Sequence, residues 1–395
     1  MRRVRLKEIG TFYSGLSGKS KSDFSEGNAL LVTYRNIFNN PVLNPAIKDT
    51  VVVGKDEKQN EVLWGDILIT GSSETPADAG MSSVVLFNPQ EKMYLNSFCF
   101  GFRLNDMNET LPSYIGHLLR STSIRAAISK TAFGVTRFNV NRMRFADIEI
   151  PLPPLNIQKE IVSILDSFTS LIDKMKQEVE MRKKQMDYYR EKLFSFGKGE
   201  CEWRTLNELF TFKNGLNKEK SDFGRGTPII NYVDVYRKRG LVKEDIKGLV
   251  NSNASEQSRY KCKKGDVFFT RTSETKEEVG FPSVLLEDIE NCVFSGFVLK
   301  ATPKTDLLDT HYCKYCFFTY KFRKEVIKSA TYTTRALTNG TSLSKISIPV
   351  PSLEKQRQIA SILDTFETYI SKLEKMIELR QKQYEYYREK LLTFE

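Results

Sequence analysis

The chain has 395 residues and a net charge of +11 at pH 7, and 40% of its residues are hydrophobic and 11% aromatic. This length is too great for one ordinary core and predicts at least two domains, while the apolar content excludes an intrinsically disordered chain. No apolar run approaches the roughly 20 residues of a bilayer span, and no apolar stretch follows the basic start. We therefore expect a cytoplasmic protein with no signal peptide and no membrane partner.

An internal repeat organises the sequence. Residues 151–196 align without gaps on residues 349–394, with 23 identical positions among 46, and both copies contain the string YYREKL. Weaker matches join the preceding parts of the chain: Gly65-Asp66 with Gly265-Asp266, Gly101-Phe102 with Gly296-Phe297, and Thr136-Arg137 with Thr334-Arg335. Because a repeat takes priority over local patterns, we interpret the chain as a tandem duplication. Its four segments are residues 1–150, 151–196, 197–348 and 349–395.

The first unit, residues 1–150, is predicted to be mixed α/β, because β-rich runs alternate with turn residues and precede one helical pattern. Its predicted elements are strands at 61–70, 82–87 and 94–104, a helix at 113–130 and a last strand at 147–150. The second unit, residues 197–348, repeats this order. Its predicted elements are strands at 260–270, 282–286 and 292–300, a helix at 310–328 and a last strand at 345–348.

The two similar segments are predicted to be long helices, because apolar residues recur at alternating spacings of four and three, which is a heptad seam. The central seam residues are Leu165, Phe168 and Ile172 in the first helix and Leu363, Phe366 and Ile370 in the second. Each seam is broken once by an arginine, Arg182 or Arg380. A polar residue in such a seam can set the register of the pair, or its charged end can extend to the edge of the interface.

A helix from about residue 156 to 195 would be roughly 60 Å long, which is too long to bury its stripe against one compact domain. We therefore expect the two helices to pack on each other. The link after the first helix is short, at residues 197–199, which favours an antiparallel pair. The predicted fold class is α+β: two mixed α/β domains joined by two long antiparallel coiled-coil helices, with an internal tandem duplication and pseudo-two-fold symmetry.

The positive charge lies in the two units rather than in the helices. Residues 1–150 hold 18 basic and 15 acidic side chains, and residues 197–348 hold 26 and 19. The helical segments are close to neutral, with 8 basic against 7 acidic side chains and 8 against 8. An acidic partner is therefore expected at the units, although a charge of this size also serves solubility alone.

Sequence signals for catalysis are weak. The GLSGKS string at residues 15–20 lacks the earlier glycine of a phosphate-binding loop, and its duplicate loses the GKS ending. Cys313 and Cys316 form the one CxxC pair, which is too few ligands for zinc. His117 and His311 are the only histidines, which argues against a nucleophile–histidine site. We expect no catalytic residue, no metal ligand and no cofactor on this chain.

Polar and basic side chains gather in predicted loops of both units, and such groups suit contacts with phosphates and base edges. The Thr-Arg pair kept in both units is the strongest candidate, although each residue by itself could be an ordinary solvated loop residue. The first-unit candidates for DNA contact are Lys19, Lys21, Arg35, Thr70, Ser72, Ser73, Thr136, Arg137, Asn139 and Arg142. The second-unit candidates are Lys218, Lys220, Asn231, Arg237, Arg239, Arg271, Thr272, Ser273, Thr334, Arg335 and Asn339.

This layout resembles the specificity (S) subunit of type I restriction-modification systems. The resemblance covers the whole chain and rests on IPLPPLxxQ at 150–158, IPVPSLxxQ at 348–356, the long helix after each and the Gly-Asp strands. It implies that residues 1–150 and 197–348 are two target recognition domains, each reading one half of a bipartite DNA sequence. It also implies that residues 151–196 and 349–395 are conserved helical spacers, which set the spacing and dock two methyltransferase (M) subunits.

The resemblance further implies a non-catalytic chain in the cytoplasm of a bacterium or archaeon. S-adenosylmethionine, ATP and Mg²⁺ would then be held by the M subunits and by restriction (R) subunits, where a system has them. Gly71 stands where the second unit has Arg271, so the two loops are not expected to read the same bases. Two alternatives remain open: a stand-alone sequence-specific DNA-binding protein, and a coiled-coil scaffold whose basic units bind protein or RNA.

Overall fold

The computed structural model describes residues 2–394, and the chain divides into two compact units. Unit 1 combines Met1–Lys176 with Lys375–Glu395, and unit 2 is Gln177–Glu374. Two long helices, α6 (Leu155–Leu193) and α13 (Leu353–Leu392), therefore contribute one part to each unit. Among residues 2–394, no helix has both the length and the apolar character that a membrane crossing requires.

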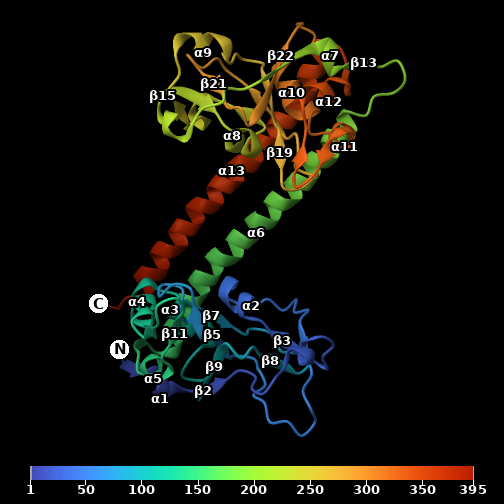
Figure 1. Ribbon diagram of the computed structural model, residues 1–395. Helices are drawn as coiled ribbons and strands as arrows, with labels where there is room; N and C mark the ends of the chain where they lie inside the picture. Colours follow the sequence, from blue (N-terminus) through green and yellow to red (C-terminus); the bar gives the residue numbers. More distant parts are fainter. Residues whose placement is uncertain (1, 395) are drawn as a thin grey trace. The chain divides into compact units, whose positions relative to one another are not determined.

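Unit 1 is built around a four-stranded antiparallel sheet of order β2-β9-β5-β7 (Figure 1). These strands are β2 (Gly10–Ser14), β5 (Ile67–Thr70), β7 (Ser82–Val84) and β9 (Cys99–Leu104). The other strands are β1 (Arg2–Arg5), β3 (Ala29–Val32), β4 (Thr50–Val51), β6 (Ser72–Ser73), β8 (Met93–Leu95), β10 (Ala132–Phe133), β11 (Phe138–Val140) and β12 (Glu149–Leu152). The helices are α1 (Leu6–Ile9), η1 (Lys21–Phe24), α2 (Tyr34–Asn39), α3 (Pro112–Leu119), α4 (Thr122–Ser129) and α5 (Arg142–Ala146).

Unit 2 repeats this plan with a five-stranded sheet of order β14-β22-β18-β20-β16. Its strands are β13 (Glu202–Thr205), β14 (Phe210–Asn214), β15 (Phe223–Ile230), β16 (Gly240–Leu241), β17 (Leu249–Val250), β18 (Val267–Thr270), β19 (Thr272–Ser273), β20 (Pro282–Leu285), β21 (Val293–Phe294), β22 (Val298–Pro303), β23 (Thr331–Tyr332), β24 (Ala336–Leu337) and β25 (Ser347–Val350). Its helices are α7 (Leu206–Leu209), η2 (Lys220–Asp222), α8 (Tyr232–Arg237), η3 (Lys243–Asp245), α9 (Ala254–Arg259), α10 (Thr310–Cys316), α11 (Tyr320–Ser329) and α12 (Gly340–Ser344).

The single helix expected late in each unit is wrong, because two helices stand there in both cases. In unit 1 the chain turns at Ser121, whose backbone is extended and whose hydroxyl donates to the Leu118 carbonyl. In unit 2 it turns at Thr319, whose Oγ1 accepts from the Phe322 N–H as an N-cap. Serine and threonine at such positions satisfy free backbone groups and start a new helix, which an apolar pattern alone does not show.

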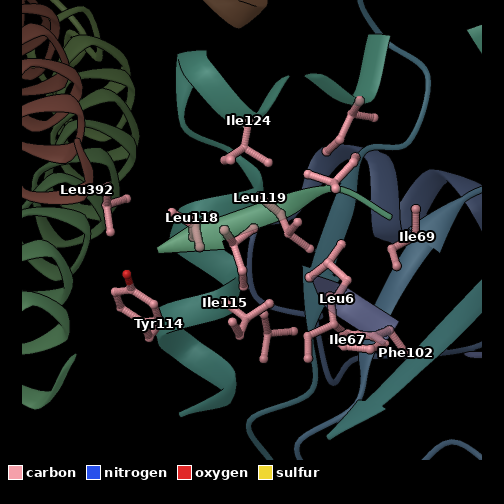
Figure 2. Close-up of a cluster of buried hydrophobic side chains, with 14 of the residues drawn as sticks. Leu6, Ile67, Ile69, Phe102, Tyr114, Ile115, Leu118, Leu119, Ile124 and Leu392 are labelled. Carbon is pink, nitrogen blue, oxygen red and sulfur yellow. The ribbon is translucent and has the colours of Figure 1, made fainter. Parts of the chain in front are cut away.

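The core of unit 1 lies between the central sheet and α3 (Figure 2). Ile115 and Leu119 of α3 share one buried cluster with Ile67 and Phe102 of the sheet. Leu392, close to the end of the chain, belongs to the same cluster. The last turn of α13 therefore completes the core that the first half of the sequence begins.

The two long helices are antiparallel, as expected. In unit 2, Lys183 of α6 pairs with Glu374 of α13, and Tyr189 further along α6 stacks on the earlier Phe366 at 5.5 Å. Partner numbers on α13 therefore fall as numbers on α6 rise. In unit 1, Phe168 makes the equivalent stack with Tyr387 at 5.4 Å. Together with the duplicated α/β units, this confirms the predicted fold class.

The seam is apolar where expected, and its two arginines have local partners. Leu165 and Ile172 are buried in unit 1, and Leu363 and Ile370 are buried in unit 2. In unit 2, Arg182 donates to Glu178 and Gln185 of its own helix and lies over the ring of Tyr369. In unit 1, Arg380 donates to Gln383. These contacts with neighbours on the helix surface favour the edge position over a buried register device.

The repeated YYREKL string attaches the end of each long helix to the α/β domain of its unit. In unit 1, both carboxylate oxygens of Glu389 accept from the Thr122 N–H at the start of α4, at 2.9 and 2.8 Å. In unit 2, Glu191 accepts from the Tyr320 N–H at the start of α11, at 3.1 and 3.0 Å. A carboxylate at a helix N-terminus satisfies a free donor and complements the helix dipole. The string is therefore repeated because the same attachment is made in both units.

A buried glutamine fixes the start of each long helix. Gln158 is fully buried, accepts from the Leu111 N–H at 2.9 Å and donates to the carbonyls of Glu109 and Pro153. Gln356 makes the same three bonds in unit 2, with Asp309, Leu307 and Pro351. Each glutamine thus satisfies three backbone groups that have no secondary-structure partner.

Replacing Gln158 with alanine leaves buried backbone groups without partners, and we expect a loss of about 3 kcal/mol in the free energy of unfolding. Urea denaturation followed by circular dichroism measures the change. Gln90→Ala, at an exposed glutamine of the same unit, is the matched control. Equal stability of the two variants would contradict the role of Gln158.

Candidate DNA interface

A three-stranded sheet in each unit carries the strongest candidates. In unit 1 its order is β10-β11-β6, and in unit 2 it is β23-β24-β19. Along β11, Val140 is buried and Phe138 partly buried, while Arg137 and Asn139 are exposed. Because alternate residues of a strand point to opposite faces, Arg137 and Asn139 share the outer face. The Thr-Arg pair expected to contact DNA therefore sits at the start of an exposed strand face.

Arg137 is held in place by two neighbours. Its Nε donates to the Ser72 hydroxyl at 3.0 Å, and its guanidinium lies 5.1 Å from the centre of the Phe98 ring. Thr136, Ser73 and these three residues line one cleft of about 640 Å³. An arginine fixed by a hydroxyl and an aromatic face loses less conformational freedom when it binds a base edge or a phosphate.

Arg335 occupies the equivalent place in unit 2 with a different partner. Its Nη2 lies 3.0 Å from Glu274, and the two side chains are 62% and 75% exposed. An ion pair this exposed contributes little stability, so a DNA phosphate or base edge can replace the carboxylate at small cost. Thr334 before it and Thr272 on the neighbouring strand are accessible as well.

Arg142 and Arg271 lie near corresponding strands of the two units but make different contacts, because Arg271 donates to the Gly296 carbonyl at 2.9 Å. Arg142 donates to the Ser14 hydroxyl at 2.8 Å and lies over Phe100. The strand pairing of Ser14 with Phe100 corresponds in unit 2 to that of Asn214 with Leu299. Arg271 lines a cleft of about 450 Å³ with Asn214, Leu299 and Gly340, and Gly340 stands where unit 1 has Arg142. The difference between Gly71 and Arg271 is thus matched by an opposite difference at a second position.

Several predicted contact residues have partners inside their own unit. Thr70 is fully buried and accepts from the Met81 N–H. Asn231 and Asn339 are the N-caps of α8 and α12, and the Asn339 side chain accepts from the Ser342 N–H. Arg239 lies against Met186 of α6 and the ring of Phe318. These bonds give the four residues structural roles, and their contact with DNA stays a prediction.

Two of the predicted lysines hold loops. Lys19 pairs with Glu57 at 2.5 Å, and this hydrogen bond, together with those from the Gln59 amide and the Gly54 N–H, lowers the pKa of the Glu57 carboxyl to about 2. Lys218 pairs with Glu256 at 2.9 Å in the equivalent place. The remaining basic candidates are exposed at the surface of their units: Lys21, Arg35, Lys220 and Arg237. Ser73 and Ser273 are largely buried.

Exposed phenylalanines at the same sites were missed by the sequence reading. Phe98 and Phe297 are 58% and 67% exposed, and their carbonyls accept from the N–H groups of Gly71 and Arg271. They are therefore equivalent, and the match of Gly101-Phe102 with Gly296-Phe297 is wrong. That match relied on a dipeptide that occurs in both halves. In the strand register, Gly101 lies opposite Leu68 and Lys300 lies opposite the equivalent Phe268, so Gly101 corresponds to Lys300.

The Gly-Asp strands have a structural role. Asp66 is fully buried, accepts from the Leu63 N–H, and binds Arg103 and the Tyr13 hydroxyl, each at 2.7 Å. In unit 2, Asp266 is instead paired with the Lys300 ammonium at 3.0 Å. A buried carboxylate needs such a partner, and the two units supply it from different strand positions. Burial and the Asp66 charge raise the pKa of the Tyr13 phenol well above its ordinary value.

The two histidines and the CxxC pair have structural roles, because the histidines bond neighbouring side chains and both cysteines are buried. His117 bridges Asp166 at 2.8 Å and the Tyr384 hydroxyl at 3.1 Å, and so joins α3 to both long helices within unit 1. In unit 2 the position of His117 is taken by Tyr315, whose hydroxyl donates to Asp364 at 2.6 Å, and His311 bonds the same carboxylate at 2.9 Å from one turn earlier on α10. Cys313 is buried, and burial raises the pKa of its thiol. In the described part of the chain, no three His, Cys, Asp or Glu side chains are grouped to hold a metal ion.

Comparison with known proteins agrees with this architecture. The family model described as the type I restriction modification DNA specificity domain matches the chain twice, over residues 1–181 and 198–381. The chain therefore belongs to this family, as its sequence layout predicted. Its two matches correspond to the two duplicated halves.

Relatives and solved structures extend over most of the chain. The type I restriction enzyme EcoR124I/EcoR124II specificity subunit of Escherichia coli is 29% identical over 304 residues, covering 73% of this chain and 72% of that protein. The EcoKI specificity subunit of Escherichia coli K12 is 24% identical over 350 residues, with 83% and 74% covered. The S subunit structure from M. genitalium gives a TM-score of 0.55 at 16% sequence identity, and the match covers 100% of this chain and 96% of that one. A structure from a study of type I R-M complex assembly gives a TM-score of 0.65 at 15% sequence identity. The match covers 99% of this chain and 97% of that one.

Replacing Arg335 with alanine is expected to weaken binding of the target duplex by roughly 1–3 kcal/mol, which is the range for a bidentate arginine–guanine contact. Fluorescence anisotropy at one fixed salt concentration measures the change. Arg357→Ala is the matched control, because Arg357 lies on α13 of the same unit and is 70% exposed. Unchanged affinity and an unchanged target sequence would remove Arg335 from the reading surface.

Proposed function

We propose that this chain is the DNA-recognition subunit of a type I restriction-modification enzyme. Each recognition domain reads one half of a bipartite target, and the long helices set the spacing and dock methyltransferase subunits. The observation that carries this is the arginine-bearing outer strand face, which occurs once in each duplicated unit with different neighbours. Two related but unequal reading surfaces fit a target made of two unequal half-sites. Membership of the DNA specificity family supports the same conclusion.

We further propose that the chain performs no chemistry itself and works in the cytoplasm of a bacterium or archaeon. The buried carboxylate of Asp66 and the imidazole of His117 have structural partners, and five of the six thiols are buried, which agrees with a binding subunit. S-adenosylmethionine, ATP and Mg²⁺ are then held by M and R subunits. A stand-alone DNA-binding protein is the second candidate, and it differs in binding its target tightly without partners.

One side of the paired helices is proposed to dock the M subunits. With Leu165 and Phe168 at heptad positions a and d, most of the exposed apolar residues of the two helices fall at g and c. In an antiparallel pair the g positions of both helices lie on one side of the seam, with c beside them. In unit 1 this set is Ile164, Leu171, Leu379 and Tyr386. In unit 2 the equivalent set is Ile362, Tyr369, Met181 and Tyr188.

The other side of each helix pair faces the recognition domain. Asp166 and Asp364, both at position b, bond His117 and His311 of the domains. The docking side therefore remains for a partner, and it recurs once in each unit. Two equivalent apolar sides indicate two copies of one partner, which matches two M subunits. Exposed apolar residues gathered in this way are typical of protein–protein contact sites.

The function is tested by mapping genomic DNA methylation in the source strain with and without the gene. We expect one bipartite motif to lose its methylation on deletion and to regain it when the gene is restored. Inserting seven residues into both helices is expected to lengthen each by about 10 Å, and so the spacer by roughly three base pairs at ~3.4 Å each. An identical methylation map with and without the gene would contradict the assignment.

The docking side is tested with Leu171→Glu and Tyr369→Glu, one in each unit. A carboxylate on this apolar side should reduce M-subunit binding at least tenfold, because it must be desolvated in the complex. Size-exclusion chromatography and mass photometry of the mixed subunits measure the assembly. Ser170→Glu adds the same charge at an exposed position f and is expected to leave assembly intact. Assembly of the double variant at wild-type concentrations would contradict this docking side.

A further inference from the structure

The register of the small outer sheet aligns three side chains in a row across each unit. In unit 1, Ser72 of β6 lies opposite Asn139 of β11, which lies opposite Phe133 of β10. Directly opposed residues in antiparallel strands point to the same face. The bond from Arg137 to the Ser72 hydroxyl shows that Arg137 shares this face, as its two-residue spacing from Asn139 requires.

Unit 2 has the same row with different side chains. Thr272 of β19 lies opposite Leu337 of β24, which lies opposite Thr331 of β23. Leu337 is 38% exposed, whereas Ala336 beside it is fully buried, so Leu337 and Arg335 lie on the outer face. Each unit therefore combines an arginine common to both with a row of three residues that differs at every position. In unit 1 the exposed members of the row are Asn139 and Phe133, whereas Ser72 is 4% exposed and acts through its bond to Arg137.

We propose that this row, Ser72–Asn139–Phe133 in unit 1 and Thr272–Leu337–Thr331 in unit 2, determines which bases each domain reads. The inference deepens the proposed function, on which it rests. The common arginine provides the same contact in both domains, and the row distinguishes them. The two strands on the outer edge of each sheet, β10 with β11 and β23 with β24, form a two-stranded ribbon. Such a ribbon fits the major groove of B-DNA, where every base pair shows a distinct pattern.

The chemistry of the row sets the kind of base each domain prefers. The exposed amide of Asn139 can bond adenine N6 and N7 together, and Phe133 beside it can contact an adjacent thymine methyl group. Leu337 can make only apolar contacts, so its partner in the second half-site is a thymine methyl group. The exposed side chains of Phe133 and Leu337 are thereby each assigned a thymine methyl group as their contact.

The decisive experiment exchanges the row in the full chain. The triple variant Ser72→Thr, Phe133→Thr and Asn139→Leu places the unit 2 row in unit 1 and keeps Arg137. Assembled with its M subunits, it should direct methylation to a motif whose first half-site is altered. The second half-site and the spacer should stay as in the wild type. An unaltered first half-site would overturn the proposal.

Two controls separate the possible failures. Phe138→Ala copies the inward-facing neighbour Ala336, and it should change stability while leaving the motif as it was. If the triple variant does not fold, the methylation motif of the single variant Asn139→Leu tests the proposal. Asn139 is exposed, so this substitution leaves the core unchanged. If the wild-type complex directs no methylation, the proposed function fails. If the wild type works and neither row variant changes the motif, only the row inference fails.

A second measurement tests Leu337 directly. Replacing single thymines of the second half-site with uracil removes only a methyl group. One such replacement should weaken binding by the wild-type complex several-fold, and the Leu337→Ala complex should be insensitive to it. Equal sensitivity of both complexes at every thymine would refute the methyl contact.

Discussion

The apolar seam of the two long helices is the constraint on which the rest of the structure depends. A helix of nearly 40 residues carries a stripe roughly 60 Å long, which no domain of this size can cover alone. Antiparallel pairing buries it, with Phe168 stacked on Tyr387 and Tyr189 stacked on Phe366. The helix ends then become parts of the domain cores, and Leu392 joins the cluster around Ile115.

Duplication preserved geometry while exchanging the residues that achieve it. The buried carboxylates of Asp66 and Asp266 keep the same turn but are neutralised by Arg103 in one unit and Lys300 in the other. Unit 1 has an arginine at position 142 and unit 2 has one at position 271, and they bond the Ser14 hydroxyl and the Gly296 carbonyl, respectively. A fold that tolerates such exchanges can present different reading surfaces on one scaffold. This is the property that a subunit reading two unequal half-sites requires.

The candidate site was predictable where residues recur and unpredictable where partners are distant. Arg137 and Arg335 were predicted because the Thr-Arg pair occurs in both halves, and both are exposed, while their contact with DNA stays a prediction. Thr70 and Asn339 look the same in sequence as exposed donors, yet their oxygens accept bonds from Met81 and Ser342. Phe98 was missed because Phe297 was aligned with Phe102 on a shared Gly-Phe dipeptide, whereas the backbone hydrogen bonds show that Phe297 corresponds to Phe98.

The sequence by itself determined the duplication, the two long helices and the heptad seam, because each depends on spacing along the chain. It also predicted the antiparallel pairing, because a three-residue link leaves little choice of direction. Only the tertiary structure decided which polar groups face outward, since burial and hydrogen bonding depend on contacts between distant segments. The row of Ser72, Asn139 and Phe133 shows this most clearly, because Ser72 and Phe133 are 61 positions apart in the sequence and both lie beside Asn139. Their common face arises from strand register, which no local pattern records.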